Sequence, residues 1–377
     1  MTQSSTMKRI GLFLEPLDTL FFRDGRPFTQ AGNARGDLPQ PQTLTGALTT
    51  HLLRQAGLED FMQWRDAFQN AGGDMALALN ECGLDEGYAD IRYRGPWPAS
   101  APNGSPQPKV FLKAPVILMW DDKPEPEAMF RYAPMRPGEL PPGWRLMEDE
   151  RVPLWIRRQD LGKAVEGFVD LEGMETFLRG ETPAKKNLHE ASSLYGYDSR
   201  TGIGINAATH SVEEGLIYSV SMLAMKKGMG FYAEIDLPET LGSSTLFQDD
   251  TILHWGGEGR RVRVQPAEPV RWPAVAVDGS KRSAYVLTTP GRFSQGWQPD
   301  APPQGASLLA ASVPGHGAVS GWDLAKGGPK PTRFTVPAGS VYFFDNDTGA
   351  NLETFSNTPD NLREGWGLVL RGVWDYA

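Results

Sequence analysis

Residues 10–54 read IGLFLEPLDTLFFRDGRPFTQAGNARGDLPQPQTLTGALTTHLLR, and this opening stretch decides the fold class. Residues 10–14 form a short apolar run of strand length, which predicts a first β-strand. In residues 42–54 the apolar side chains recur at helical spacing, with Thr43 as the expected N-cap and Gly57 as the expected stop. The chain is therefore expected to begin with a strand followed by a helix.

The rest of the chain is predicted to be rich in short strands. We expect an irregular helical region at 58–90, a loop-rich segment at 94–150 and a short helix at 174–178. Strands are expected at 200–206, 216–225, 229–235, 261–265, 283–288, 307–312, 340–344 and 367–370. This order indicates an α+β protein with antiparallel sheets. A strand–helix–strand start is also compatible with a ferredoxin-like β-α-β-β-α-β unit.

The bulk composition limits the class of protein. A length of 377 residues predicts two domains, and 42 glycines and 31 prolines favour turns and short strands. Cys82 is the only cysteine, which excludes an internal disulfide and a cysteine-based zinc site and fits a reducing compartment. The first residues lack the pattern of a secretory signal and no apolar run has the length of a membrane span, so we expect a soluble cytoplasmic protein. The net charge of −9 argues against a protein wrapped on all sides by nucleic acid.

A glycine- and arginine-rich segment at 254–261, HWGGEGRR, is a candidate for RNA contact. Flexible backbone donors, guanidinium groups and a stacking surface are what single-stranded RNA recognition uses. The candidate residues are Gly256, Gly257, Gly259, Arg260 and Arg261. The equally weighted alternative is a β-hairpin turn with exposed arginines.

Three further segments carry candidate RNA-binding residues. Arg23 and Arg26 lie in a tight turn, where the alternative for one of them is an ion pair with the neighbouring Asp24. Residues 185–202 are expected to form a mobile loop that either orders on RNA or has no partner. The glycine-rich segment 363–372 is expected to run as a loop into a strand, with a purely structural turn as its alternative. The candidates in these last two segments are Lys185, Lys186, Arg200, Arg363, Gly365 and Gly367.

No catalytic constellation emerges from the sequence. None of the five histidines has metal-ligand spacing, and no nucleophile elbow accompanies them. His51 or His189 can act as a general acid or base only if it reaches an RNA phosphate, and a packed or surface role is the simpler interpretation. Acidic pairs such as Asp121–Asp122 lack supporting ligands, so no metal and no cofactor is expected.

Taken in order, several segments resemble one known family. They are FRDGRPF at 22–28, PQPQTLTGAL at 39–48, RTGIGI at 200–205, EEGLIY at 213–218, GGEGR at 256–260, KPTR at 330–333, VPAGSVY at 336–342 and GWG at 365–367. This ordered set resembles the Cmr subunit three family, a RAMP component of type III-B CRISPR effector complexes. The second motif adds Thr43, Thr45 and Gly46 as candidate RNA contacts. Residues 58–150 carry little of the resemblance.

The resemblance implies two ferredoxin-like, RRM-related domains with antiparallel sheets. The expected ranges are 1–210, with a loop-rich insertion at about 58–200, and 211–377. It further implies a non-catalytic subunit that binds and caps the 5′ repeat-derived tag of crRNA. The implied partners are the large polymerase-like (cyclase) subunit, the backbone RAMP ribonuclease subunit and, indirectly, target RNA. The alternatives are a RAMP endoribonuclease that processes CRISPR transcripts through His51 or His189, and a purely protein-bridging subunit.

Overall fold

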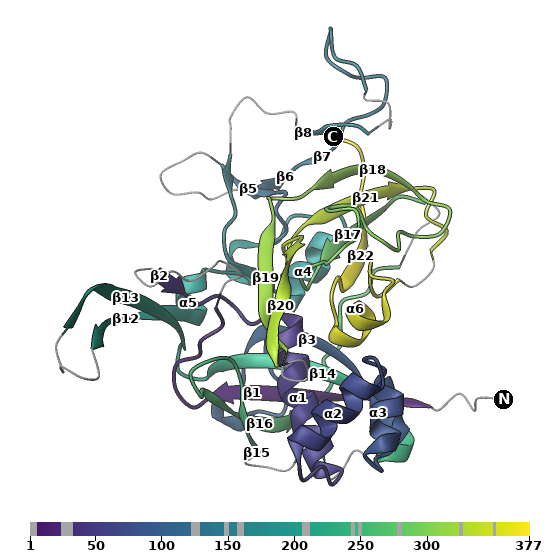
Figure 1. Ribbon diagram of the computed structural model, residues 1–377. Coiled ribbons are helices and arrows are strands. Elements are labelled where there is room, and N and C mark those ends of the chain that lie inside the picture. The colour runs from purple at the N-terminus through teal and green to yellow at the C-terminus, as the bar shows by residue number, and fades with distance from the viewer. Residues whose placement is uncertain are drawn as a thin grey trace. The chain divides into compact units, whose positions relative to one another are not determined.

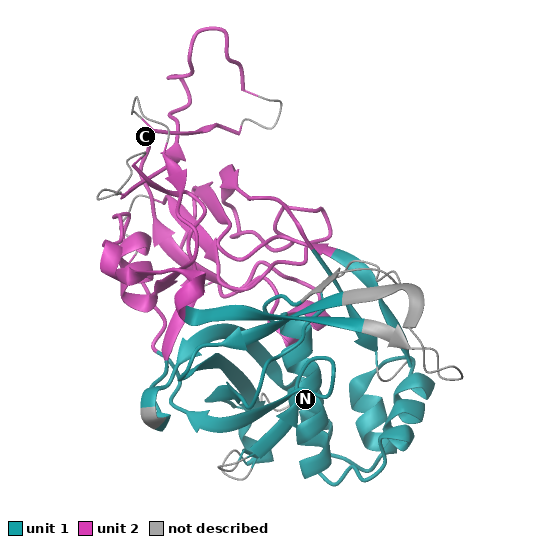
Figure 2. Cartoon of the chain, turned by 90° about the vertical axis from the view of Figure 1, so that its left-hand side faces the viewer, with its two compact units in different colours: residues 1–108, 194–270, 318–333 teal, residues 109–193, 271–317, 334–377 magenta. Residues whose placement is uncertain are grey.

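The computed structural model describes residues 6–23, 33–121, 129–146, 151–156, 162–205, 212–242, 246–247, 251–276, 281–323, 327–349 and 352–377. The chain forms two compact units, each built from three separate segments (Figure 2). Unit 1 comprises residues 1–108, 194–270 and 318–333, and unit 2 comprises residues 109–193, 271–317 and 334–377. This division differs from the expected boundary at 210/211, because two strands from beyond this boundary, Met229–Pro238 and Arg261–Ala267, pair with the first strand of the chain.

Unit 1 contains an antiparallel sheet with the first strand of the chain in its middle (Figure 1). β1 (Met7–Pro16) lies between β14 (Met229–Pro238) and β16 (Arg261–Ala267) and is antiparallel to both. β3 (Arg92–Ser100) pairs with β14, and β15 (Thr251–His254) pairs with β16. The strands predicted at 10–14, 229–235 and 261–265 are therefore confirmed.

Helix α1 (Pro41–Gln55) supplies the core that covers one face of this sheet. Leu44, Leu48 and Leu52 are almost completely buried in the same cluster as Leu12 of β1. Burial of one such leucine side chain contributes about 1.5–3 kcal/mol. Two short helices, α2 (Phe61–Asn70) and α3 (Met75–Glu81), extend the cluster, which confirms the predicted helical region after residue 58.

The ends of α1 test two predictions. The chain leaves the helix at Gly57, which has a φ of +104° and donates its N–H to the carbonyl of Arg54, so the predicted stop is confirmed. Thr43 as the N-cap is wrong, because the N-cap is Gln40, three residues earlier, and Pro41 stands in the first turn. Proline fits this position, since its missing N–H would have no partner inside the helix. The Thr43 hydroxyl instead donates to the Gln40 carbonyl over 2.7 Å.

A second, smaller sheet in unit 1 replaces part of the predicted mobile loop. β12 (Tyr195–Ile205) and β13 (Val212–Met225) form a long antiparallel pair, and β2 (Asn33–Arg35) adds to β13 in parallel. The expectation of a mobile loop at 185–202 is therefore wrong for residues 195–202, whose backbone is paired over its whole length. The strands predicted at 200–206 and 216–225 are confirmed with earlier starts.

Unit 2 contains a four-stranded antiparallel sheet. β17 (Ser283–Leu287) lies between β21 (Val341–Asp345) and β22 (Val369–Val373), and β18 (Ser307–Ser312) pairs with β21. Helix α6 (Pro359–Glu364) connects β21 to β22. These strands confirm the predictions at 283–288, 307–312 and 340–344, whereas the last strand begins at 369 rather than 367.

The remaining elements are short, and several lie in the segment predicted to be loop-rich. Residues 92–120 contain three strands, so a description of the whole 94–150 segment as loop-rich is wrong for this part. The further elements are η1 (Glu86–Asp90), η2 (Pro102–Gly104), β4 (Lys109–Lys113), β5 (Leu118–Trp120), β6 (Met129–Arg131), β7 (Ala133–Pro134), β8 (Leu154–Trp155), β9 (Lys163–Ala164), β10 (Phe168–Asp170), α4 (Leu171–Leu178), η3 (Lys185–Asn187), β11 (Leu188–His189), α5 (Ala191–Leu194), η4 (Glu239–Leu241), β19 (Gly317–Asp323) and β20 (Gly328–Thr335).

Both units share one strand order. With four strands of each main sheet numbered along the chain, the order across the sheet is second, third, first, fourth: β3-β14-β1-β16 in unit 1 and β18-β21-β17-β22 in unit 2. In unit 1 α1 follows the first strand, and the described residues between the third and fourth strands contain η4 and β15 but no α-helix. In unit 2 α6 precedes the fourth strand, and the described residues between the first and second strands contain no helix. The chain is an α+β protein with mostly antiparallel sheets.

A buried carboxylate ties the strands of unit 2 together. Asp347 is 2% exposed and accepts hydrogen bonds from the hydroxyls of Ser283 and Tyr285 and from the N–H of Gly349. The guanidinium of Arg371, on the neighbouring β22, lies 2.9 Å from the same carboxylate. Burial alone raises the pKa of Asp347, but these hydrogen bonds and the Arg371 charge hold it below its usual range. The carboxylate is therefore ionised and fully paired inside the protein.

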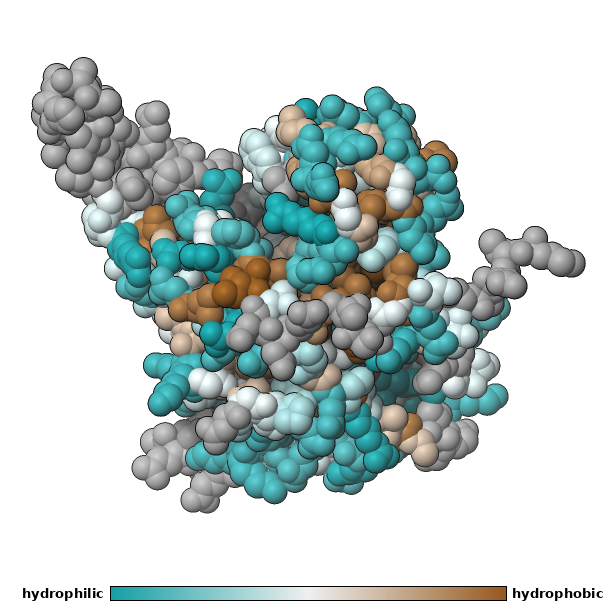
Figure 3. All heavy atoms as spheres, turned by 90° about the horizontal axis from the view of Figure 1, so that it is seen from below, coloured by the Kyte–Doolittle hydropathy of each residue, from teal (hydrophilic) through white to brown (hydrophobic). Residues whose placement is uncertain are grey.

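On the face seen in Figure 3 hydrophilic residues cover most of the area, and hydrophobic residues are exposed in a smaller region near its centre. Among the described residues no helix is long and apolar enough to cross a bilayer.

Candidate nucleic-acid interface

The main candidate site is a pocket within unit 1, called the α1 pocket below. Its volume is about 830 Å³, which falls in the range of about 300–1,000 Å³ typical of small-molecule sites. Four parts of the chain line it: one side of α1 along its length, the segments around residues 21–23 and 37–40, the end of β15 with the turn after it, and the β19–β20 hairpin. The pocket therefore depends on segments that are far apart in the sequence.

The charge of the α1 pocket is opposite to that of the chain. Arg23, Arg54 and Lys330 line it, and Asp37 is the only carboxylate among the lining residues that the structure describes. Three bases and one acid leave two net positive charges, whereas the chain as a whole carries −9. Within the described part of the chain neither Arg23 nor Arg54 has an ion-pair partner. Both guanidinium groups can therefore bind an external anion by donating hydrogen bonds to it.

Three motif residues, Thr43, Thr45 and Gly46, lie in the first turns of α1 but differ in their relation to the pocket. Thr43 and Gly46 line the pocket, and Gly46 is exposed, so the helix approaches a ligand there without a side chain in the way. Thr45 is buried and does not line the pocket. The N-terminal turn of α1 lines the pocket through Gln42 and Thr43, so the positive end of the helix dipole lies there, whereas Arg54 lies in the last turn.

The turn between β15 and β16 places Gly256 and Gly257 in the pocket wall. The N–H of Gly257 donates to the Phe21 carbonyl over 2.8 Å, and the turn closes with a 2.9 Å bond from the Trp255 N–H to the Arg260 carbonyl. Gly256 has a φ of +88°, and a Cβ at this position would lie 2.6 Å from the Phe21 carbonyl oxygen. The glycines are therefore required by the close approach of two backbones, and the hairpin-turn interpretation of 254–261 accounts for the shape of this segment.

The remaining residues of this turn do not line the pocket. Arg260 is directed inward, with its guanidinium 2.7 Å from Asp18 and 3.0 Å from the sulfur of Met222. Arg261 and Gly259 are exposed. The structure thus gives Arg260 an intramolecular partner, whereas the exposed Arg261 stays a predicted RNA contact.

The candidates elsewhere in the described chain do not line the α1 pocket. Arg200 lies on β12 and pairs with Asp198 over 2.7 Å, and Lys186 pairs with Glu172 over 3.1 Å in unit 2. Lys185 lies 6.0 Å from the centre of the Trp120 ring. Arg363 belongs to α6 of unit 2, and Arg26 lies outside the described residues.

The glycine-rich segment near the C-terminus has a structural role. Gly365 is buried, ends α6 with a φ of +81° and donates its N–H to the Asn361 carbonyl. Gly367 is buried and donates its N–H to the Pro290 carbonyl over 2.8 Å. Because these backbone donors are used inside the protein, the structural-turn interpretation accounts for the two glycines.

The two histidines considered for catalysis lie in different units. His51 lines the α1 pocket, and its Nε2 lies 3.0 Å from the Leu246 carbonyl, which can only accept, so Nε2 carries the proton. Burial lowers the pKa of His51, which keeps the ring neutral at pH 7. His189 lies 3.5 Å from the buried Asp170 and against Phe111. Within the described ranges no cluster of His, Cys, Asp and Glu could hold a metal ion.

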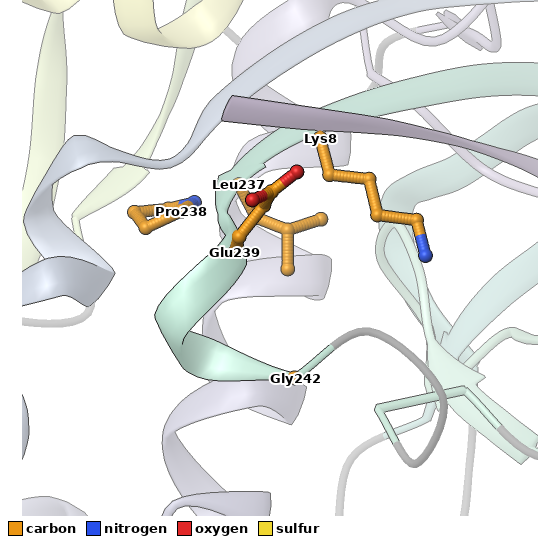
Figure 4. Close-up of a pocket in the computed structure, with 5 residues that line it drawn as sticks. All are labelled: Lys8, Leu237, Pro238, Glu239 and Gly242. Atoms are coloured by element: carbon orange, nitrogen blue, oxygen red, sulfur yellow. The ribbon is translucent and has the colours of Figure 1, made fainter. Parts of the chain in front are cut away.

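A second hollow in unit 1 lacks the positive character of the α1 pocket. Figure 4 shows it between the start of β1 and the end of β14, with a volume of about 290 Å³. Its lining contains one base, Lys8, and one acid, Glu239, together with Leu237, Pro238 and Gly242. With one charge of each sign it offers no preference for an anionic ligand.

The residues of the α1 pocket that sequence reasoning missed include Arg54, Lys330, Ile252 and Trp322. Ile252 is 49% exposed and Trp322 is 62% exposed, although both side chains are apolar or aromatic. A usable signal was present, because residues 317–335 combine Trp322 and Phe334 with Lys326, Lys330 and Arg333 and only one acid, Asp323. Aromatic and basic residues interleaved in this way are typical of single-stranded nucleic-acid binding.

Comparison with known proteins identifies the family. A family model described as CRISPR-associated protein (Cas_Cmr3) matches residues 12–374. A comparison with curated proteins found no match. Among solved structures, a subunit of a type III-B Cmr-beta complex bound to cognate target RNA and AMPPNP is 15% identical, with a TM-score of 0.47 over 89% of this chain and 86% of that chain. A chain of a Csm3–Csm4 subcomplex of a type III-A interference complex is 11% identical, with a TM-score of 0.40 over 96% and 98% of the two chains. The match of the family model over almost the whole sequence shows that the chain belongs to the Cmr3 family of CRISPR-associated proteins.

Proposed function

We propose that this chain is a non-catalytic subunit of a type III-B CRISPR effector complex, and that it binds and caps the 5′ repeat-derived tag of crRNA in the α1 pocket. The observation that carries the proposal is the charge contrast: two net positive charges line this pocket in a chain of net charge −9. Arginine and lysine side chains around a concave surface bind phosphate, and a local patch is sufficient to hold one RNA end.

The proposal includes two ferredoxin-like domains. The common strand order of the two units and the helix after β1 in unit 1 support it. A ferredoxin-like unit has two helices, and each unit here retains one of them. Unit 1 retains the helix after the first strand, and unit 2 retains the helix before the fourth.

We also propose that the acidic remainder of the surface faces protein partners. Without the two net charges of the α1 pocket, the chain's −9 becomes −11. Such a surface repels RNA, so it is better suited to contacts with the large polymerase-like subunit and with the backbone RAMP ribonuclease subunit. This chain then contacts target RNA only indirectly, through the other members of the assembled complex.

RNA crosslinking within the assembled complex tests the proposal. Photoreactive nucleotides placed in the 5′ tag of the guide are expected to crosslink to this chain, at peptides that contain residues 21–23, 37–54 or 318–330. Nucleotides placed at the 3′ end of the same guide provide the control and are expected to crosslink elsewhere. If no tag nucleotide crosslinks to this chain, a purely protein-bridging role replaces the proposed one.

The competing function is a RAMP endoribonuclease that uses His51 or His189. The two rings lie in different units, and His51 presents a neutral ring whose Nε2 already donates to a carbonyl. We therefore expect labelled repeat RNA to stay intact with the wild-type chain, and the His51→Ala and His189→Ala variants to give the same result. Cleavage by the wild type that either substitution abolishes would make the chain an enzyme.

A further inference from the structure

The β19–β20 hairpin presents an exposed indole beside the cations of the α1 pocket. Trp322 lines the pocket and is 62% exposed, and Lys330 of the same hairpin lines it as well. Ile252 of β15, at 49% exposure, is a second apolar lining group. An aromatic surface among cations is the combination that binds single-stranded nucleic acid, because the cations attract phosphates and the ring stacks on a base.

A hydrogen bond holds this hairpin against helix α1. The side chain of Gln42 is 8% exposed, and its Nε2 donates to the Ser320 carbonyl over 2.6 Å. The next residue is Gly321, where a Cβ would lie 3.1 Å from the same Nε2, so a larger residue would press on the amide. Since α1 is anchored in the core of unit 1, Gln42 fixes the backbone immediately before Trp322.

We propose that Trp322 stacks on one unstacked nucleobase of the bound RNA and that Gln42 is the positioning residue for this platform. The inference rests on the proposed function, which it deepens by naming what the pocket receives. A volume of about 830 Å³ is sufficient for a single nucleotide. Arg23, Arg54 and Lys330 then contact the phosphates on either side of the stacked base.

The first test measures binding of the full chain to a short, fluorescently labelled single-stranded RNA with the tag sequence. Trp322→Ala is expected to weaken binding roughly 5- to 150-fold, the loss that corresponds to one base–aromatic stack. Trp322→Phe keeps a π-face and is expected to retain most of the affinity. Trp144→Ala is the matched control, since Trp144 is 54% exposed and lies in unit 2.

The second test separates positioning from folding. Gln42→Ala and Gln42→Glu both remove the donor to the Ser320 carbonyl, and both are expected to weaken RNA binding while the thermal unfolding midpoint changes little. RNAs with a single abasic nucleotide then locate the stacked base. At one position the abasic substitution is expected to weaken binding to the wild type and to Trp144→Ala, but not to Trp322→Ala.

The outcomes distinguish this inference from the proposed function. Unchanged affinity of Trp322→Ala, or an equal loss for each abasic RNA with wild type and Trp322→Ala, overturns the stacking role. If binding at the same time depends on Arg23 and Arg54, the proposed function stands without it. Absence of tag binding by both the wild-type chain and the assembled complex overturns the proposed function itself.

Discussion

The double variant Arg23→Glu/Arg54→Glu is expected to bind single-stranded tag RNA about 100-fold more weakly than the wild type, or worse. Each guanidinium lines the α1 pocket and is without an ion-pair partner in the described part of the chain. A hydrogen bond to a charged group contributes about 1.5–3 kcal/mol, and two such losses correspond to a factor of about 100 or more. The reversed charges add repulsion of the phosphates, so the pocket changes from attractive to repulsive.

The salt dependence of binding shows whether these arginines contact phosphates. Each lost phosphate contact on a single strand is expected to reduce the slope of log K against log salt concentration by about 0.7. Arg92→Glu is the control, because Arg92 is an exposed arginine of unit 1 that does not line the pocket. A double variant with wild-type affinity and an unchanged slope would remove the α1 pocket as the RNA site.

Asp347→Ala is expected to destabilise the protein by about 3–5 kcal/mol, the range for breaking a buried ion pair from one side. The substitution leaves the guanidinium of Arg371, whose side chain is 11% exposed, without its partner, and it leaves the Tyr285 hydroxyl without its acceptor. Urea denaturation followed by circular dichroism measures the loss. Asp360→Ala is the control, since Asp360 is exposed, and it is expected to cost less than about 1 kcal/mol.

The same carboxylate makes stability depend on pH in a defined direction. Because the folded state holds the pKa of Asp347 below its usual range, its contribution is complete above about pH 4, the ordinary range of an aspartate. The contribution is lost as the pH falls through the folded pKa, since the unfolded chain then binds the proton more readily. Asp347→Asn removes this component, so its stability is expected to fall less steeply with acid than that of the wild type. An identical acid limb in both proteins would show that Asp347 is not paired as described.

Local patterns predicted the regular elements well where one physical rule dominated. The helical spacing of Leu44, Leu48 and Leu52 and the stop at Gly57 were readable because α1 buries one face against a sheet. The N-cap was mistaken because Pro41 starts the helix without a side-chain cap, so the hydroxyl of Thr43 was a misleading signal. The mobile loop predicted at 185–202 failed because β12 is stabilised by pairing with β13, a partner that composition does not reveal.

The candidate site was predicted only in part, and the reason is distance along the chain. Arg23, Thr43, Gly46, Gly256 and Gly257 were named from the sequence and all line the α1 pocket. Arg54, Trp322 and Lys330 were missed because nothing local links a helix near residue 50 with a hairpin near residue 320. For Gly365 and Gly367 two interpretations stayed open, because a glycine needed for an internal turn has the same sequence pattern as one that admits a phosphate.

The central position of β1 has a consequence for how the protein folds during its synthesis on the ribosome. Both neighbours of this strand, β14 and β16, are made more than 200 residues later, at Met229–Pro238 and Arg261–Ala267. During synthesis the nascent chain therefore carries an unpaired apolar strand and a helix with one uncovered face, a state that invites aggregation. A shorter message that encodes only residues 1–210 would leave the strand permanently without these neighbours. Recombinant production thus calls for the uninterrupted reading frame, with translation conditions or chaperones that shield the early product.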